Sequence, residues 1–496
     1  MEKYRQIDAK ALEDRGRPDG AAARRIFQAE YTGFSKKIIV LDDDPTGTQT
    51  VHDVSVYTDW SYESILEGFC EDRNMFFLLT NSRSFSEEKT KQVHREIGER
   101  IVRASRETKK DFLVISRGDS TLRGHYPLEM EVLGEALKEY DGRMPDGEIL
   151  CPFFKEGGRY TIDSVHYVQE KGKLIPAAQT EFAGDATFGY SHSELGEYVE
   201  EKSRGRKKSQ DCIRITLDML RGPDLEVPSE KLLEAGGFST VLVDAVCYED
   251  VEIFCAALLK ALKAGKRFLI RSAAAVPKVL GNIADKPLLG REELIKPGSV
   301  TAGGTITDAA SVPGGIVLAG SHVKKTTVQL ERLREADCPL SFLEFNVNTC
   351  FQEEGLSAEA DRITDRASEE MKKGNTAVVY TSRELFAPAG YSKEELLKAS
   401  VRISDAVTSV IQKLTVRPRF IIAKGGITSS DVAVKALAIK KAVVMGQIQP
   451  GIPVWMTGSE SKFPGMPYVI FPGNVGGEDT LKKVVETLSR DSEEQQ

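Results

Sequence analysis

The stretch IIVLDDDPTG, residues 38–47, joins four consecutive apolar residues to three carboxylates, a proline and a glycine. This pattern is typical of a buried strand that ends in a sharp turn. The carboxylates of Asp42, Asp43 and Asp44 repel one another, so we expect a metal ion or a cationic group beside them. The stretch therefore predicts a core strand with a functional turn at its carboxyl end.

Short apolar runs of the same kind recur along the whole chain, and amphipathic segments with helical spacing separate them. Runs of this length between helical patterns are typical of buried parallel strands. We therefore predict an α/β fold of two domains, each with a mostly parallel sheet flanked by helices. The predicted strands are 37–41, 75–79, 112–115, 148–153, 241–246, 268–270, 316–319, 342–345, 377–380, 420–423, 443–445, 453–456 and 468–471.

The domain boundaries follow from length and composition. A chain of 496 residues is too long for one core, which predicts two domains. Near the middle of the chain the alternation of apolar runs and helical segments stops, and Gly, Pro, Ser and Thr become frequent, as expected for a linker. We predict a helical N-terminal extension over 1–34, a first α/β domain over 35–284, a linker over 285–314, a second α/β domain over 315–490 and a polar tail over 491–496.

Composition limits the partners of the protein. The chain is 41% hydrophobic and 29% charged, as in ordinary globular proteins, and its formal charge of -8 gives no general attraction to nucleic acid or to an anionic membrane. The seven cysteines include no C-x-x-C pair and their number is odd, which favours reduced thiols. No signal peptide or run of about 18 apolar residues is found. We expect a cytoplasmic protein with small-molecule partners, and the sequence leaves homo-oligomer formation open.

Two loops that follow predicted strands of the first domain carry arginines, carboxylates and hydroxyls. The carboxyl ends of parallel strands share one edge of a sheet, so these loops should meet the turn at 42–46 in one crevice. An arginine fork can hold a carboxylate, and hydroxyl groups can bind a polyol, which together suit a small sugar acid. A surface ion pair is the alternative for any one arginine. The candidate residues of these loops are Asn81, Ser82, Arg83, Asp119, Ser120, Thr121 and Arg123.

Two further segments of the first domain have less specific patterns. Residues 180–190 form a long, glycine-containing and aromatic loop, which is either a lid that excludes water from the crevice or an ordinary packed loop. Residues 151–159 end another strand and carry two more cations, Lys155 and Arg159, to which the sequence assigns no role.

The second domain has three turns that each join a strand to a helix. Gly320-Ser321 places a serine near a helix N-cap, where unpaired N–H groups favour phosphate, although a capping serine without a ligand is the commoner case. Paired glycines at 425–426 and 476–477 would let the backbone approach a ligand closely. Neither a Walker loop nor a protein-kinase H-R-D signature is present. The candidate nucleotide-binding residues are Ser321, Gly425, Gly426, Ile427, Thr428, Gly473, Asn474, Gly476 and Gly477.

These motifs together resemble the four-carbon acid sugar kinases, over roughly residues 36–488. The family's D-D-x-T-G turn is matched at Asp43 to Gly47 and its D-S-T-x-R-G loop at Asp119 to Gly124. Its G-S, G-G-x-T and G-N-x-G-G turns are matched at 320–321, 425–428 and 473–477. Each motif alone is unspecific, but their combination in this order is specific to the family.

The resemblance implies transfer of the γ-phosphate of ATP, with Mg²⁺, to a terminal hydroxyl of threonate, erythronate or a 3-oxo-tetronate. ATP would bind the second domain and the sugar acid the first, with the active site in the cleft between them. One of Asp43 and Asp44 would orient or deprotonate the hydroxyl, and the other, Asp44 in our assignment, would bind Mg²⁺ with Asp119 nearby. Arg83 and Arg123 would bind the carboxylate, and Asn81, Ser82, Ser120 and Thr121 complete the expected substrate site.

Two other functions match parts of the sequence. Asp42-x-Asp44-x-Thr46 after a strand also matches the start of haloacid dehalogenase-like phosphatases, with Asp42 and Asp44 as the working carboxylates. The phosphatase motif requires a second aspartate after Asp119, which this sequence lacks. A phosphatase would also give no function to the glycine turns of 425–477. A non-enzymatic sugar-acid sensor would need a module for binding a partner or DNA, and the sequence offers no basic helix cluster for one.

Overall fold

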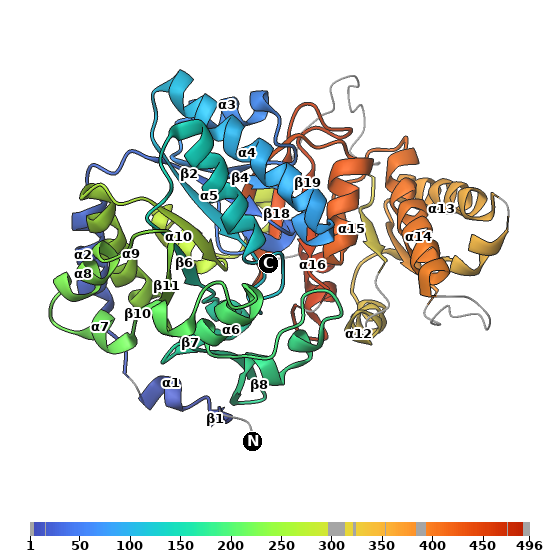
Figure 1. Cartoon of the computed structure of the whole chain (residues 1–496). Coiled ribbons are helices and arrows are strands. Elements are labelled where there is room, and N and C mark those ends of the chain that lie inside the picture. The colour runs from blue at the N-terminus through green and yellow to red at the C-terminus, as the bar shows by residue number, and fades with distance from the viewer. Residues whose placement is uncertain are drawn as a thin grey trace. The chain divides into compact units, whose positions relative to one another are not determined.

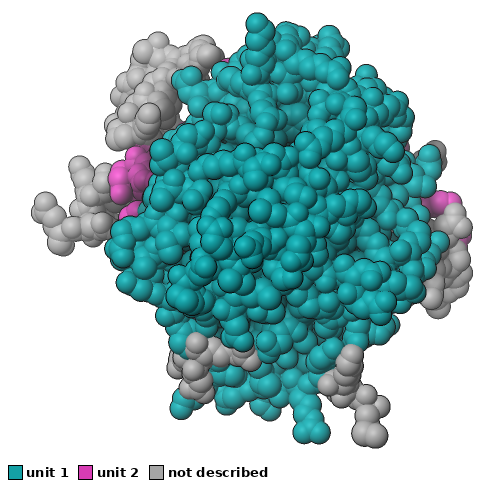
Figure 2. Space-filling model, turned by 60° about the vertical axis from the view of Figure 1, so that its left-hand side comes forward, with its two compact units in different colours: residues 1–285 teal, residues 286–496 magenta. Residues whose placement is uncertain are grey.

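The computed structural model of the chain describes residues 4–14, 16–295, 313–320, 324–352, 354–382, 393–473 and 475–489. The chain divides into two compact units, residues 1–285 (unit 1) and 286–496 (unit 2), which Figure 2 colours separately. The predicted linker at 285–314 falls partly on residues 296–312, which lie outside the described residues.

Unit 1 is built on a parallel sheet with the strand order β10-β11-β6-β12-β5-β2-β4-β3. Strands β2, β4 and β6 are buried along their whole length, which explains the apolar runs 38–41 and 75–79 in the sequence. The strands of this sheet are β2 (Lys37–Asp42), β3 (Val54–Tyr57), β4 (Met75–Leu79), β5 (Phe112–Arg117), β6 (Gly147–Cys151), β10 (Ile213–Ile215), β11 (Ser239–Val243) and β12 (Phe268–Ser272).

The helices of unit 1 pack beside this sheet (Figure 1). Helix α4 contacts both α3 and α5, and α9 contacts α2, α8 and α10. The helices of the unit are α1 (Ala11–Asp14), α2 (Gly20–Tyr31), α3 (Tyr62–Cys70), α4 (Glu87–Thr108), α5 (Leu128–Asp141), α6 (Leu195–Lys202), α7 (Leu217–Arg221), α8 (Glu226–Leu233), α9 (Tyr248–Lys263) and α10 (Ala275–Leu280).

The N-terminal segment is tied to unit 1 at two places. Helix α2 begins after the N-cap Asp19, buries Phe27 and places Arg24 against Glu252 of α9 at 3.1 Å. Strand β1 (Ile7–Asp8) joins a small antiparallel sheet of order β1-β9-β8-β7, with β7 (Arg159–Ile162), β8 (Val165–Glu170) and β9 (Lys173–Pro176). The sequence did not predict this sheet, because its strands mix polar and apolar residues without a regular pattern.

Unit 2 has the strand order β17-β18-β19-β16-β13-β15-β14. Strands β19, β16, β13, β15 and β14 are parallel, whereas β18 is antiparallel to both β17 and β19. Only Pro450 and Gly451 join β17 to β18, which is too short for a parallel crossover. The strands are β13 (Ile316–Ala319), β14 (Leu340–Phe345), β15 (Thr376–Thr381), β16 (Ile421–Lys424), β17 (Lys441–Gln449), β18 (Ile452–Thr457) and β19 (Pro467–Phe471).

The helices of unit 2 pack beside this second sheet. Helix α12 contacts α16, while α13 contacts β14, β15 and α14. They are α11 (Arg291–Leu294), α12 (Lys324–Leu333), α13 (Gly355–Lys372), α14 (Lys393–Lys413), α15 (Gly426–Asp431) and α16 (Thr480–Ser489). Among the described residues, no helix has the length and apolar character needed to cross a bilayer. The predicted α/β class, with two domains and mostly parallel sheets, is confirmed.

Candidate functional site

Unit 1 gathers its charged groups at the carboxyl edge of the parallel sheet. Strand β2 lies between β4 and β5, and β5 lies next to β12, so the residues at the ends of these four strands are neighbours. They bring the carboxylates of residues 42–44 to the guanidinium groups of Arg83, Arg117 and Arg271. A cluster of mixed charge therefore lies at this edge, where the loop positions predicted that these residues meet.

Asp43 lies at the centre of this cluster and its side chain is only 2% exposed. Arg83 donates to both of its oxygens, from Nη2 to Oδ1 at 2.6 Å and from Nε to Oδ2 at 3.3 Å. Nη2 of Arg271 lies 3.9 Å from Oδ2, and Nη1 of Arg117 lies 4.0 Å from Oδ1. Burial raises the pKa of Asp43, and Arg83 and Arg271 oppose that rise. Asp43 is thus a buried carboxylate among three guanidinium groups, with a pKa moved towards that of a useful base.

Asp42 is enclosed by its own turn. Its residue is 1% exposed, and its Oδ1 lies 3.5 Å from Nη1 of Arg117. A Cβ atom at Gly47 would lie 1.9 Å from its Oδ2, so only glycine fits there. Burial is the main cause that raises the pKa of Asp42 to about 8, and the carboxylates of Asp43 and Asp44 contribute. An enclosed and mainly protonated carboxyl group is poorly suited to be the nucleophile of a phosphatase.

Asp44 is the most exposed of the three carboxylates, with 18% of its side chain exposed. It caps the 3₁₀ turn Pro45–Thr48, because its Oδ1 accepts the N–H of Thr46 at 2.8 Å. Its Oδ2 lies 3.3 Å from Nη1 of Arg83. Among the residues described, no group of three or more His, Cys, Asp or Glu side chains could hold a metal ion by itself.

The loop of residues 118–124 wraps around Arg271. A Cβ atom at Gly118 would lie 2.0 Å from Nη2 of Arg271, and one at Gly124, where φ is +127°, would lie 2.8 Å from the same atom. The two glycines therefore allow the loop to close on the guanidinium group. Within the loop, Asp119 accepts hydrogen bonds from Nε of Arg123 at 2.8 Å and from the hydroxyl of Thr121. Burial would raise the pKa of Asp119, but Arg83 and Arg123 outweigh burial and hold it well below its usual value.

Glu129, at the start of α5, pairs with Arg271 behind this loop. Nη1 of Arg271 donates to Oε2 of Glu129 at 2.6 Å, and the hydroxyl of Ser82 donates to Oε1 at 2.8 Å. Burial opposes ionisation of Glu129, but Arg271 and the nearby His94 lower its pKa to about 2. Arg271 and Glu129 were not predicted. An arginine directly after the apolar run of β12 is a signal that could have found Arg271, whereas Glu129 looks like an ordinary acidic residue of a first helical turn.

The expected substrate residues differ in what their side chains can reach. Ser82 and Thr121 are buried, and their hydroxyls already bind Glu129 and Asp119. Asn81 adopts a left-handed conformation with φ of 55° and is partly exposed. Ser120 is also partly exposed, and its carbonyl accepts from Nε2 of His166 at 2.8 Å. Ser82, which was expected to meet the substrate hydroxyls, is instead placed to hold Glu129.

The loop at 180–190 packs on the loop of residues 118–124. The hydroxyl of Tyr190 donates to the carbonyl of Thr121 at 2.8 Å, and Oδ2 of Asp185 lies 3.7 Å from Nη1 of Arg123. The ring of Phe182 lies beneath both Arg123 and Arg159, at 5.1 and 5.3 Å from their guanidinium carbons. Among the described residues, no carboxylate lies within ion-pair distance of Arg159, although Asp119 and Glu170 act on its charge, and its buried Nε has no hydrogen-bond acceptor. Nη1 of Arg159 donates to the carbonyl of Gly157, so this cation, to which the sequence assigned no role, is held beside the cluster.

In unit 2, the three predicted turns lie together because β16 lies between β13 and β19. The N–H of Gly425 donates to the carbonyl of Phe471 at 2.8 Å, which joins the second turn to the third. A Cβ atom at Gly320 would lie 2.9 Å from Oγ1 of Thr428, so the first turn touches the second. Nε2 of Gln329 in α12 donates to the carbonyl of Gly477 at 2.8 Å. Ser321 and Asn474 lie outside the described residues.

Two glycines of these turns take conformations that suit close backbone approach. Gly425 precedes α15 with φ of +118° and Gly476 has φ of +81°, values that favour glycine. Ile427, in the first turn of α15, is 71% exposed, which is unusual for a large apolar residue.

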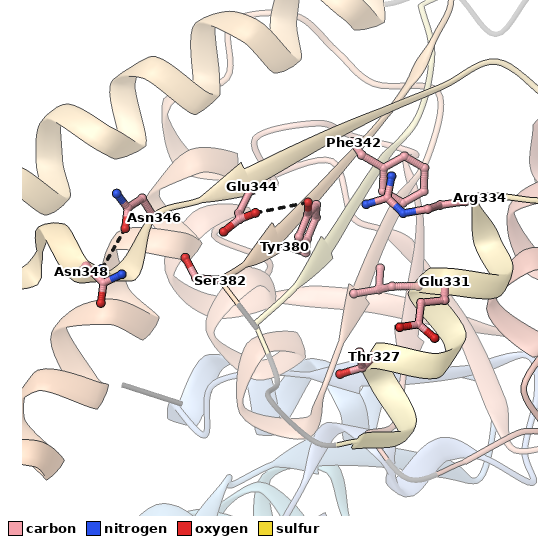
Figure 3. Close-up of a pocket in the computed structure, with 10 residues that line it drawn as sticks. Thr327, Glu331, Arg334, Phe342, Glu344, Asn346, Asn348, Tyr380 and Ser382 are labelled. Atoms are coloured by element: carbon pink, nitrogen blue, oxygen red, sulfur yellow. Dashed lines mark hydrogen bonds between the residues drawn. The ribbon is translucent and has the colours of Figure 1, made fainter. Parts of the chain in front are cut away.

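A cavity of about 740 Å³ opens in the same unit, beside the first turns of α12 (Figure 3). Phe342, Glu344 and Tyr380 face it from β14 and β15, and the hydroxyl of Tyr380 donates to Glu344 at 3.5 Å. Thr327 and Glu331 face it from α12, and Arg334, the residue after that helix, lies 4.0 Å above the ring of Phe342. Its size is within the range of small-molecule sites.

The comparisons with known proteins address both units. Residues 38–280 match the family of sugar-binding N-terminal domains, and residues 316–481 match the family of nucleotide-binding C-terminal domains. The comparison with curated proteins found no match.

Two solved structures share the fold of the whole chain. One is a Salmonella typhimurium LT2 protein that carries the name tRNA synthase, with 16% identity, a TM-score of 0.61, and coverage of 90% of this chain and 98% of that one. The other is the Haemophilus influenzae protein HI1011 of the DUF1537 family, with 16% identity, a TM-score of 0.57, and coverage of 91% and 100%. With a sugar-binding domain followed by a nucleotide-binding domain, in the order in which the sequence places their motifs, the chain belongs to the four-carbon acid sugar kinase family.

Proposed function

We propose that the protein transfers the γ-phosphate of ATP to the terminal hydroxyl of a four-carbon acid sugar, namely threonate, erythronate or a 3-oxo-tetronate. The observation that carries this proposal is the pairing, in one chain, of a sugar-binding domain that buries Asp43 among arginines with a nucleotide-binding domain whose three glycine turns converge. Phosphoryl transfer needs mainly positioning and charge neutralisation, and these two arrangements supply both.

The acid sugar is assigned to unit 1. Its carboxylate would bind Arg83 and Arg123, joined by Arg159, which has no described carboxylate within ion-pair distance. Its hydroxyls would bind the partly exposed Asn81 and Ser120, while Ser82 and Thr121 hold Glu129 and Asp119 in place.

Asp43 is assigned as the base of the reaction. It would accept the proton of the terminal hydroxyl as that oxygen bonds to the γ-phosphorus, and the bond from the γ-phosphorus to the bridging oxygen breaks to release ADP. The raised pKa of Asp43 favours this role, and Asp119, with a lowered pKa, would remain a carboxylate and hold Arg123.

Mg²⁺ fits this site only as an ion that arrives with the nucleotide. Such an ion takes most of its oxygen ligands from phosphates and water and needs one or two carboxylates from the protein. Asp44, the most exposed of the three, would supply one. The ion would neutralise charge on the phosphate oxygens during transfer.

The proposal is tested by measuring ATP consumption with purified protein against the threonate, erythronate and 3-oxo-tetronate isomers. We expect one of them to be phosphorylated, with the product identified by mass spectrometry. The neutral four-carbon tetritols, which lack the carboxylate, are the matched control and should not be turned over. If the folded protein failed to consume ATP with every one of these acids, the proposal would be overturned.

Replacing Gly426 by Val should raise the KM for ATP roughly tenfold or more, a loss of about 1.4 kcal/mol of binding. The branched side chain would stand at the first residue of α15, where the backbone is expected to approach the phosphates. The KM for the acid sugar should change little, because that substrate is assigned to unit 1. Gly236→Val, at a position in unit 1 with open space around it, is the control and should leave both KM values unchanged. An unchanged ATP KM in folded Gly426→Val would contradict the assignment of this turn.

A further inference from the structure

Lys424, the last residue of β16, is a buried lysine without an anionic partner among the described residues. The residue is 0% exposed. Its Nζ lies 3.5 Å from the carbonyl oxygen of Pro472 and 4.1 Å from the centre of the Phe471 ring. A carbonyl at that distance is a weak acceptor, so the amine is enclosed with most of its hydrogen-bonding capacity unused. Buried lysines are rare unless they are paired.

The elements around Lys424 offer no described negative charge to it. The neighbouring residues are Ala319 on β13 and Phe471 on β19. Helix α12 contributes Lys325, a second cation, and the acidic residue of α15, Asp431, pairs with Lys435 at 3.1 Å. Burial lowers the pKa of Lys424 to about 7, and Lys325 adds to the shift. In the empty protein the amine is therefore mainly neutral at pH 8.

The amine of Lys424 lies near the glycine-rich turns, where it could bind an anion. Lys424 immediately precedes Gly425, its Nζ touches the turn that follows β19, and the cation that acts on it stands in the first turn of α12. The carbonyl of Pro472, which follows β19, and Lys325 of α12 thus lie near Nζ of a residue that itself precedes the turn at Gly425. An anion bound by the turns would supply the missing partner, and lysine is a common phosphate ligand.

We propose that Lys424 is a nucleotide-binding residue whose ammonium group binds a phosphate of the nucleotide held by Gly320, residues 425–428 and the glycines 476–477. This inference rests on the proposed function, since it takes the anion to be a nucleotide phosphate. Because the bound phosphate stabilises the ammonium form, binding is coupled to uptake of a proton from solvent by the neutral amine.

The coupling is measured by calorimetric titration of the full-length protein with Mg·ADP at pH 8, in buffers of different ionisation enthalpy. At that pH the phosphates of free ADP are already deprotonated, so proton uptake reports on the protein. We expect about one proton taken up for each ADP bound. Binding without proton uptake would overturn the proposal, and this readout needs no variant.

Lys424→Met is the matching substitution, since methionine fills a similar volume without a charge. We expect it to bind ADP roughly 10- to 100-fold more weakly, to lose the proton uptake, and to keep or raise the melting temperature, because a costly buried amine is removed. Lys373→Met, at a surface lysine of unit 2 that pairs with Glu370 at 2.6 Å, is the control and should bind like the wild type. Unchanged ADP affinity in Lys424→Met would assign Lys424 a structural role only. Absence of ADP binding by the wild type would instead contradict the proposed function itself.

Discussion

Asp43→Asn is expected to reduce turnover of the acid sugar by about 10²- to 10⁴-fold, the range in which a single general base contributes. Asparagine keeps the shape of the side chain and can still accept a hydrogen bond from Arg83, but it cannot take the proton of the substrate hydroxyl. ADP affinity, measured by calorimetry, should stay close to that of the wild type, because the nucleotide is assigned to unit 2. Steady-state kinetics at saturating ATP measures the loss.

Asp42→Asn is the matched control for this prediction, one residue earlier in the same turn. Since the pKa of Asp42 is raised to about 8, its carboxyl group is mainly protonated at pH 7, and an amide is a close mimic of that form. We expect turnover near that of the wild type. A phosphatase that uses Asp42 as nucleophile would lose its activity in this variant, so the pair also separates the two enzyme hypotheses. Wild-type turnover in Asp43→Asn would remove Asp43 from the mechanism.

Arg271→Met should lower the free energy of unfolding of unit 1 by about 3–5 kcal/mol, the usual cost of removing one partner of a buried ion pair. Glu129 would stay in the interior without the guanidinium group that lies 2.6 Å from it. The loop of residues 118–124 would also lose the group around which Gly118 and Gly124 close. Chemical denaturation followed by tryptophan fluorescence of Trp60, which lies in this unit, measures the change.

The pH dependence of this effect has a definite sign. The folded-state pKa of Glu129, about 2, lies below its ordinary value of 4.5, so the stability that the pair contributes is present above pH 4.5 and is lost as the pH falls towards 2. The difference between wild type and Arg271→Met should therefore be complete at neutral pH and shrink in strong acid. A constant difference across that range would contradict the ion-pair explanation.

A surface pair provides the control. Arg95 and Glu139 also form an arginine–glutamate pair in unit 1, but both side chains are about half exposed. Arg95→Met should change stability little, because exposed pairs contribute weakly. Adding Glu129→Leu to Arg271→Met should recover part of the lost stability by removing the stranded charge. If the double variant were less stable than the single one, the buried charge would not be the cause of the loss.

Individual strands show most clearly how much of the fold can be predicted from the sequence. Residues 37–41 and 75–79 predict β2 and β4 almost to the residue, since a continuous apolar run followed by turn residues is a local signal. Residues 443–445 and 453–456 were correctly predicted as strands, but β17 and β18 form an antiparallel hairpin rather than two parallel strands. Whether two neighbouring strands are parallel or antiparallel depends on the length of the segment that connects them. The apolar runs alone do not predict this.

The sequence by itself determined the α/β class, the strand ends at which the charged and glycine-rich loops stand, and their order along the chain, because each of these depends on residues close together in the chain. Only the tertiary structure decided that Asp42 is enclosed while Asp44 is partly exposed. It also decided that the hydroxyl of Ser82 binds Glu129, and that Lys424 is buried without a described counter-charge. Arg271 and Glu129, 142 residues apart, form one buried pair. Burial and electrostatic partners arise when distant strands pack side by side, and the pKa of a group follows its surroundings in space rather than its neighbours in sequence.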